Sequence, residues 1–276
     1  MASILITGKG GSGSWKIRGE QLGEAIGATV KPNATASDVK AHDVVVVVKK
    51  LPDQSVLRHA KRVVWDIVDA WPQPTGNSWD EWQAKRWLND TFRTDCVFAT
   101  QKMQADSESN GLFLRHHYRP GIAENPIRQA VKKIGYEGSE RYLSNWRPVI
   151  EAECAARGWR FVVNPAELAD LDIVLAVRGG EFDGYATRNW KSCVKLSNAV
   201  GSLTPIICLP ESGYKEVAPL GVVWADKPEW LANCFDFLAS HAERLRVAES
   251  FARHRDWFSL GTVSREYSRW LQELRF

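Results

Sequence analysis

Short apolar runs separated by helical segments recur along the whole chain, and this alternation constrains its fold more than any other feature. The runs expected as strands are residues 3–7, 28–31, 44–49, 62–67, 96–99 and 111–115, and then 130–136, 159–163, 173–177, 206–209 and 221–224. The helices expected between and after them are residues 15–26, 37–41 (capped by Ser37), 55–60, 80–91 and 101–109, and then 140–156 (broken near Pro148), 191–201 (ended by Gly201) and 228–241, followed by a helical tail over 242–276. Strands that alternate with helices favour doubly wound parallel sheets.

Two such series fit into 276 residues, which is enough for two domains of roughly 100–150 residues each. Residues 119–126 are expected to form a linker between them. We therefore predict an α/β fold of two Rossmann-like domains that face each other across a cleft, an N-terminal domain over residues 1–122 and a second domain over residues 123–256.

Composition excludes several classes of protein. The net charge of +3 is too small for a dedicated nucleic-acid scaffold. No apolar run approaches the roughly 18–20 residues of a membrane span, and the N-terminus has no signal-peptide pattern. The five cysteines form no C-x-x-C pair, which favours reduced thiols in a cytoplasmic protein. No spacing of His, Cys and carboxylates indicates a metal site.

A glycine-rich loop, Gly8 to Gly13, follows the first expected strand. It satisfies G-x-G-x-x-G, so a nicotinamide-binding Rossmann protein is one alternative. That fingerprint needs an acidic residue after the second strand, where this chain has Lys31-Pro32-Asn33. The other interpretations are a tight strand-to-helix turn, or a loop that lets a substrate approach the backbone. For that last case, the residues expected to meet the substrate are Ser14, Trp15, Lys16, Arg18 and Trp71.

Titratable residues follow other strands of the first half. Asp66 and Asp69 come at the end of residues 62–67, and His117 follows residues 111–115. Each is a candidate general base, with Asp69 preferred among the carboxylates. The alternatives are a turn or helix-cap role for the aspartates and a hydrogen-bonded structural role for the histidine.

A second group of candidates follows strands of the second half. Because ligands of open α/β sheets bind outside the carboxyl ends of the strands, cations there are suited to a diphosphate and carboxylates to sugar hydroxyls. The residues in this group are Gly138, Ser139, Arg178, Lys191, Lys195, Asn198, Glu211, Ser212, Gly213 and Glu216. A salt-bridging role is the alternative for Arg178.

These features together resemble the GT-B glycosyltransferases at four places. Residues 8–18 resemble the glycine loop of the first domain, and residues 135–139 resemble the loop that opens the second. Residues 191–216 resemble the donor block of a helix, a turn that contains a glycine and a proline, a buried strand and a glutamate-bearing loop. Residues 257–276 resemble a final helix that returns to the first domain.

The resemblance implies a hexosyltransferase that moves a sugar from a nucleotide-sugar, UDP-glucose first among the candidates, to an acceptor hydroxyl without an essential metal. Arg178 with Lys191 or Lys195 would hold the diphosphate, Glu216 would meet the ribose, and residues 211–213 would lie beside the sugar. Gly13 would also contact the donor, and the residues expected to meet the acceptor are Ser14, Trp15, Lys16, Arg18 and Trp71. Retaining members carry Glu-Ala where this chain has Asn198-Ala199. Asparagine can hydrogen-bond the ribose but carries no charge.

The acceptor is left open between three classes. The chain is also similar to phage glycosyltransferases that act on hydroxymethylated bases, which implies double-stranded DNA as one acceptor and the host cytoplasm as the location. Basic clusters at Arg58–Arg62 and Arg115–Arg119 are compatible with it. The others are a saccharide and a small molecule. A non-catalytic nucleotide-binding protein is the alternative to an enzyme, and a monomer is expected.

Overall fold

The computed structural model describes residues 2–71, 94–107 and 111–274. The helix expected over residues 80–91 lies outside these ranges. The chain divides into two compact units, each described below by itself. The first comprises Met1–His116, Asn189–Ser192 and Leu260–Phe276, and the second comprises His117–Arg188 and Cys193–Ser259.

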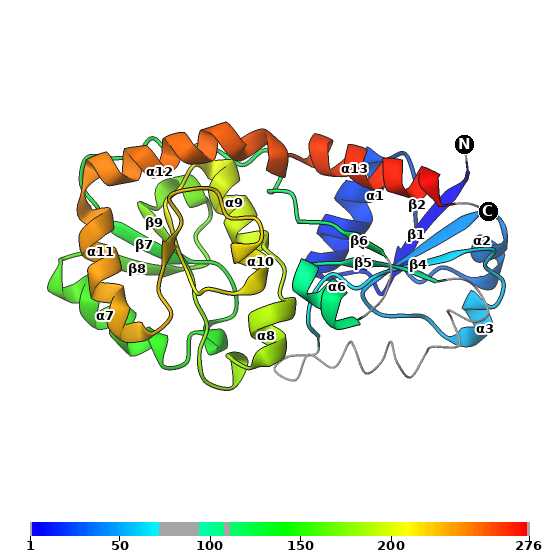
Figure 1. The fold of residues 1–276 in the computed structure, drawn as a ribbon, viewed down its shortest axis with the longest axis horizontal. Helices are drawn as coiled ribbons and strands as arrows, with labels where there is room; N and C mark the ends of the chain where they lie inside the picture. The colour runs from blue at the N-terminus through cyan, green and yellow to red at the C-terminus, as the bar shows by residue number, and fades with distance from the viewer. Residues whose placement is uncertain (1, 72–93, 108–110, 275–276) are drawn as a thin grey trace. The chain divides into compact units, whose positions relative to one another are not determined.

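The first unit contains a six-stranded parallel sheet in the order β2-β1-β3-β4-β5-β6 (Figure 1). Its strands are β1 Ile4–Gly8, β2 Thr29–Val30, β3 Val44–Val48, β4 Val63–Asp66, β5 Asp95–Phe98 and β6 Gly111–Phe113. Its described helices are a π-helix over Trp15–Gln21 continued by α1 Leu22–Ala25, then α2 Ala36–Lys40, α3 Gln54–Leu57, α6 Gln101–Ser107 and α13 Leu260–Glu273.

Both faces of this sheet are covered, which explains the run of five valines in β3. Val45 and Val47 belong to one apolar cluster with Trp65, while Val44, Val46 and Val48 belong to another. Successive strand residues point to opposite faces, so a strand buried on both sides is apolar throughout. Figure 1 shows α1 and α13 on one side of the sheet and α3 and α6 on the other.

The C-terminal helix belongs to the first unit, as the resemblance implied. α13 packs on α1, and Val263, Tyr267 and Leu271 are buried in the cluster that contains Trp15. The helical tail expected over residues 242–276 is divided into α12 His241–His254, a 3₁₀ turn over Arg255–Phe258, and α13, with Ser259 between the last two.

The second unit contains a five-stranded parallel sheet in the order β11-β10-β9-β7-β8. Its strands are β7 Lys133–Tyr136, β8 Arg160–Val163, β9 Ile173–Ala176, β10 Ile206–Cys208 and β11 Val223–Trp224. Its α-helices are α7 Trp146–Ala156, α9 Val194–Ser202, α10 Ser212–Lys215, α11 Leu231–Ala239 and α12, together with α8 Tyr185–Trp190, whose last two residues are assigned to the first unit. Its 3₁₀ turns are Glu140–Tyr142, Leu168–Asp170, Gly180–Phe182, Pro228–Trp230 and Arg255–Phe258. The predicted fold class, two doubly wound parallel sheets, is confirmed.

Local differences from the sequence predictions have identifiable causes. The cap of α2 is Thr35, whose hydroxyl and Asp38 form a capping box, and not Ser37. The helix expected over residues 140–156 is interrupted before Trp146 and not at Pro148. Pro148 stands in the first turn of α7, where the missing N–H of proline costs no intrahelical hydrogen bond.

The helix expected over residues 191–201 also begins and ends elsewhere. Lys191 lies between α8 and α9, and α9 continues through Gly201. A side chain at Gly201 would collide with the ring of Tyr118, so this glycine permits close packing. Leu203, with φ of 58°, ends the helix.

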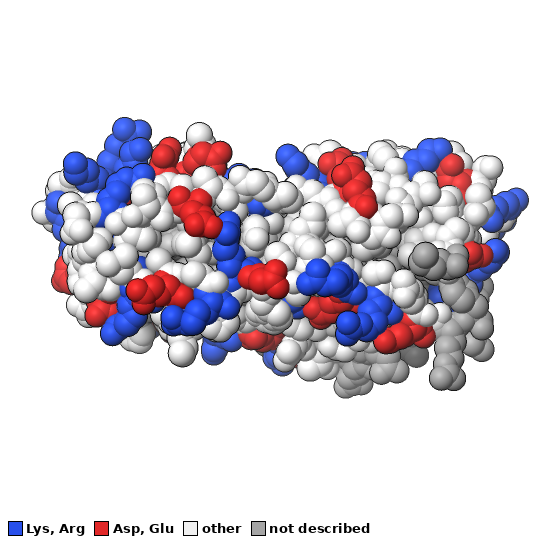
Figure 2. Space-filling view, turned by 90° about the horizontal axis from the view of Figure 1, so that it is seen from above, with Lys and Arg blue, Asp and Glu red and all other residues white. Residues whose placement is uncertain are grey.

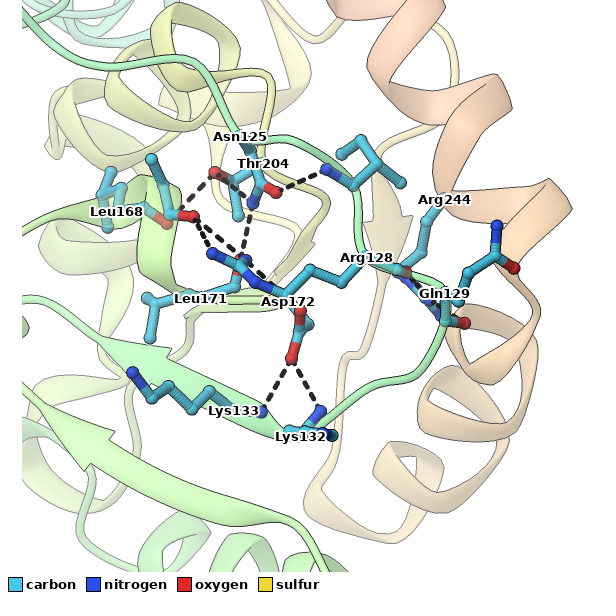
Figure 3. A network of polar contacts seen from close by, with 12 residues as sticks. Asn125, Arg128, Gln129, Lys132, Lys133, Leu168, Leu171, Asp172, Thr204 and Arg244 are labelled. Atoms are coloured by element: carbon cyan, nitrogen blue, oxygen red, sulfur yellow. Dashed lines mark hydrogen bonds and ion pairs between the residues drawn. The ribbon is translucent and has the colours of Figure 1, made fainter.

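A polar network anchors the segment that leads into β7 (Figure 3). The carboxylate of Asp172 accepts hydrogen bonds from the backbone N–H groups of Lys132 and Lys133, at 2.6 and 2.8 Å. Asn125 donates to the carbonyl of Leu171 and to the hydroxyl of Thr204. The segment expected as a linker is therefore tied to the sheet.

Candidate functional site

The carboxyl edge of the second sheet brings together polar side chains that end or follow three of its strands. From β7 the chain first adds β8 on one side and then adds β9 and β10 on the other side, so the strand order switches between β7 and β9. Open parallel sheets bind ligands at such a switch point. Tyr136 ends β7, Arg178 follows β9, and Glu211 follows β10.

Arg178 and Glu211 form a buried ion pair at this edge. Nε of Arg178 lies 2.5 Å from Oε1 of Glu211, and the two residues are 5% and 1% exposed. Burial acts to lower the pKa of Arg178, but the charge of Glu211 outweighs it and the pKa is raised. The pair therefore stays ionised, and Arg178 has part of its hydrogen-bonding capacity committed to Glu211.

Tyr136 and Lys195 lie beside this pair. The Tyr136 side chain is fully buried, and among the described residues its hydroxyl has no hydrogen-bond partner. Burial raises the pKa of Tyr136 to about 12, so the hydroxyl is neutral. Nζ of Lys195 lies 4.0 Å from the centre of the Tyr136 ring, a cation–π distance. The ring thus holds an ammonium group of the α9 N-terminal turn at the sheet edge.

Asn198 joins the loop after β7 to the segment before the sheet. Its Nδ2 donates to the carboxylate of Glu137 at 3.3 Å, and its Oδ1 accepts from the backbone N–H of Arg119 at 3.0 Å. Next to Glu137, Gly138 has φ of 131° and donates its N–H to Asn164, and Ser139 is exposed. Asn198, which stands at the position compared above with a glutamate, therefore fixes the loop after β7 through these two hydrogen bonds.

The residues after β10 form a short helix where a loop was expected. Glu211 precedes α10, Ser212 and Gly213 are in its first turn, and Glu216 follows its last residue. The backbone N–H of Glu216 donates a helical hydrogen bond of 2.9 Å to the carbonyl of Ser212. Ser212 and Glu216 are half-buried, and Gly213 is buried.

Lys191 belongs to the first unit, where it meets Asp69. Its ammonium group pairs with one oxygen of Asp69, and Nζ of Lys49 lies 3.0 Å from the other. Burial alone would raise the pKa of Asp69, but the two lysines outweigh it and hold the pKa below its ordinary value. An ionised carboxylate between two ammonium groups is a weak base, and the cluster has a net positive charge.

The backbone that carries this cluster is strained. Lys49 and Val68 both have φ of 69°, and in each case the flanking residues are joined by an i-to-i+2 hydrogen bond, Lys50 to Val48 and Asp69 to Ile67. These are γ-turns with positive φ, which are rare and strained. Such strain concentrates at functional sites and costs on the order of 1–3 kcal/mol per residue.

Asp66 and Arg18 face each other in the interior of the first unit. Both side chains are 1% exposed, and Nε of Arg18 lies 3.8 Å from Oδ2 of Asp66. Burial raises the pKa of Asp66 although Arg18 opposes the shift. A contact of either residue with a substrate would require this pair to open.

The other candidates of the first half differ in their exposure and contacts. Ser14 is half-buried and accepts a 3.4 Å hydrogen bond from Lys49, while Gly13 and Lys16 are exposed. Trp15 is 3% exposed and Trp71 packs against an apolar cluster with Trp190. His117 is 2% exposed, its Nδ1 bonds to the carbonyl of Tyr118, and it belongs to the second unit.

Sequence reasoning missed Tyr136 and Lys49 as site residues. Both had a usable signal, because each stands at the carboxyl end of an apolar run that was predicted as a strand. Within the described residues, no group of three or more His, Cys, Asp or Glu side chains is placed to hold a metal ion. None of the described helices is long and apolar enough to cross a membrane.

Comparison with known proteins gives structural matches. No protein-family model matches the chain, and no curated protein matches it by sequence. Among solved structures, it is similar to HepE from Anabaena in complex with UDP and glucose, with a TM-score of 0.68, 10% identity, and coverage of 99% of this chain and 100% of that one.

Two further matches agree with it. AviGT4, a glycosyltransferase involved in avilamycin A biosynthesis, has a TM-score of 0.59 at 12% identity and coverage of 99% and 98%. A UDP-forming α,α-trehalose-phosphate synthase from Burkholderia xenovorans has a TM-score of 0.52 at 11% identity and coverage of 87% and 76%. At these identities the likeness establishes the fold, and the chain has a GT-B-like fold of two Rossmann-like units.

Proposed function

We propose that this protein is a glycosyltransferase that moves a hexose from a nucleotide-sugar, UDP-glucose first among the candidates, to an acceptor hydroxyl. One observation carries the proposal. The ammonium group of Lys195, the Arg178–Glu211 pair and the buried Tyr136 hydroxyl gather at the switch point of the second sheet. The GT-B-like fold supports it, and the matched HepE structure is a complex with UDP and glucose.

Each group has a distinct part in the proposed donor site. Lys195 stabilises the negative charge that develops on the departing diphosphate, as fixed cations do in such reactions. The Tyr136 hydroxyl is neutral and buried, so it donates a hydrogen bond to an oxygen of the nucleotide-sugar only after the side chains that cover it move aside. Arg178 shares its guanidinium between Glu211 and the donor, and Gly138 and Ser139 let the ligand approach the backbone.

On the acceptor side, we propose that Asp69 orients Lys49 and Lys191 and does not act as a base. The low pKa of Asp69 supports this role. Asp66, the alternative carboxylate, is buried against Arg18. Ser14 is within hydrogen-bonding distance of Lys49 and would contact the acceptor beside it.

The basic clusters that suggested a DNA acceptor are largely paired with carboxylates. Lys61 pairs with Asp43 at 2.6 Å, Arg62 with Asp95 at 2.7 Å, and Arg115 with Glu266 at 2.6 Å. On the face shown in Figure 2, basic side chains (blue) and acidic side chains (red) are interspersed. We therefore propose a saccharide or another small molecule as the acceptor.

A thermal-shift panel of UDP-sugars, GDP-sugars, NAD and ATP tests the donor class. At a ligand concentration 100-fold above the dissociation constant, binding adds about 2.7 kcal/mol to the free energy of unfolding. We expect a UDP-sugar to raise the Tm most. Protection by NAD alone would identify an oxidoreductase, and UDP binding with no consumption of the donor in the presence of saccharides would indicate a non-catalytic nucleotide-binding protein.

A further inference from the structure

A pocket in the first unit lies at the carboxyl ends of β1, β2 and β3. Its volume is about 340 Å³, within the range of ligand pockets, roughly 300–1,000 Å³. β1 contributes Thr7 and Gly8, the loop after β2 contributes Asn33 and Ala34, and the loop after β3 contributes residues 50–53. The adjacent carboxyl ends of parallel strands are where open sheets bind ligands.

Left-handed backbone shapes all three of the loops around this pocket. Gly10 has φ of 75°, Asn33 has φ of 52°, and Lys49 has φ of 69°. Glycine and asparagine adopt this conformation at little cost, whereas it is unfavourable for Lys49. The strain at Lys49, in the loop that supplies residues 50–53 to the pocket, is typical of a functional site.

The lining of the pocket has the chemistry of a polar, anionic ligand. Leu51 and Ala34 are buried and provide an apolar floor. Lys9 and Lys50 are exposed cations, and Asn33 and Asp53 offer an amide and a carboxylate. Two ammonium groups against one carboxylate leave a net positive charge.

We propose that this pocket binds a small polyhydroxylated anion, a sugar that carries a phosphate or a carboxylate, and that this molecule is the acceptor. Lys9 and Lys50 neutralise the anionic group, while Asn33 and Asp53 bond to hydroxyls, for which amides and carboxylates are suitable partners. The assignment of this sugar as the acceptor rests on the proposed function, whereas the prediction that the pocket binds it does not.

The chemistry of the pocket disfavours the ribose of NAD. A dinucleotide site needs an acidic side chain after the second strand to bind the 2′-hydroxyl. Asn33 stands in that loop, and the carboxylate of the pocket, Asp53, comes from the loop after β3 and accepts a hydrogen bond from the backbone N–H of Ser55.

Calorimetric titration with glucose 6-phosphate, glucuronate, glucose and AMP tests the binding. We expect one of the two anionic sugars to bind, and the better one identifies the anionic group. Lys9→Ala and Lys50→Ala should each weaken that binding at least tenfold. Lys40→Ala removes an exposed lysine in α2 of the same unit, and binding to this control should be unchanged.

UDP titrated into the same variants separates this proposal from the donor assignment. Lys50→Ala should bind UDP as the wild type does, because the proposed donor residues belong to the second unit. Failure of both anionic sugars to bind, retention of their affinity in both lysine variants, or tighter binding of AMP would overturn the pocket proposal, whatever the result with UDP. Anion binding without transfer to the bound sugar would overturn its role as acceptor.

Discussion

At the scale of single residues, the cluster of Asp69, Lys49 and Lys191 shows how neighbours decide what a carboxylate can do. Its position after a strand made Asp69 the preferred base. Two ammonium groups keep it ionised and weakly basic. A carboxylate held in this way orders the lysines and stabilises the fold.

The pH dependence of stability tests this description. Because the pKa of Asp69 is lower in the folded state than its value of about 4 in the unfolded chain, its contribution is complete above that pH and is lost as pH falls through the folded pKa. Asp69→Asn should lower the free energy of unfolding by about 1–3 kcal/mol at pH 7, and the difference should shrink below pH 4. Urea unfolding at several pH values measures it.

The matched control is Glu24→Gln, which alters an exposed carboxylate in α1. It should have little effect at any of these pH values. A difference for Asp69→Asn that is the same at pH 7 and at pH 3 would contradict the proposed pairing.

Two buried tyrosines test the proposed place of Tyr136 in the donor site. Tyr136 and Tyr267 are both fully buried, and neither hydroxyl has a hydrogen-bond partner among the described residues. Tyr136→Phe should leave stability unchanged or slightly higher, since a buried hydroxyl without a partner is unfavourable. It should weaken UDP-glucose binding about 5–10-fold, the loss of roughly one hydrogen bond.

Tyr267→Phe is the control, because Tyr267 belongs to the first unit. Its Kd for UDP-glucose should equal that of the wild type in the same titration. An unchanged Kd for Tyr136→Phe would remove Tyr136 from the donor site.

At the scale of elements, Arg244 of α12 supports the chain entering β7 (Figure 3). The side chain is 1% exposed and donates to the carbonyls of Leu238, Ala239, Arg128 and Gln129 over 2.6–3.0 Å. One guanidinium thus satisfies acceptors from two separate segments. Its pKa is lowered by burial, against the opposing charge of Asp172.

Removing this guanidinium should be costly. Arg244→Met leaves several carbonyls without their donor and should lower the free energy of unfolding by about 3 kcal/mol. Arg246→Met, on the same helix, removes a side chain that is 69% exposed and pairs with Glu243, so it should change stability by less than about 0.5 kcal/mol. Equal denaturation midpoints for the two variants would contradict the structural role of Arg244.

The elements also show what the sequence could and could not predict. Strands such as β3 were predictable because their residues are apolar on both faces. The placement of Lys191 was not predictable, because it depends on where the segment Asn189–Ser192 packs. The backbone of Ala70 and the hydroxyl of Thr100 bond to the carbonyls of Trp190 and Asn189 in the first unit, and nothing local encodes these contacts.

Some features of the candidate site could also be predicted from the sequence, and others could not. Arg178, Lys195 and Glu211 were identifiable because strand ends and helix starts mark them. The partner of each was not, because ion pairs such as Arg178–Glu211 join residues that are far apart in sequence. The strained backbone conformation of Lys49 could not be predicted either, since no glycine marks that turn.

At the scale of the whole molecule, we propose that the two units bind different substrates. Each has its own parallel sheet, and each presents charged side chains at the carboxyl ends of its strands. We assign the nucleotide-sugar to the second unit and an anionic acceptor to the first. The first assignment is the central claim, because the enzymatic function depends on it.

Calorimetric titration of UDP-glucose into the wild type and Lys195→Ala tests that claim most directly, with Lys132→Ala as an exposed-lysine control in the same unit. We expect the wild type and the control to bind equally well. Lys195→Ala should bind at least tenfold more weakly, about 1.4 kcal/mol, at an unchanged Tm. No binding by the wild type, or full affinity in Lys195→Ala, would contradict the account, and a large fall in the Tm of this variant would make Lys195 structural.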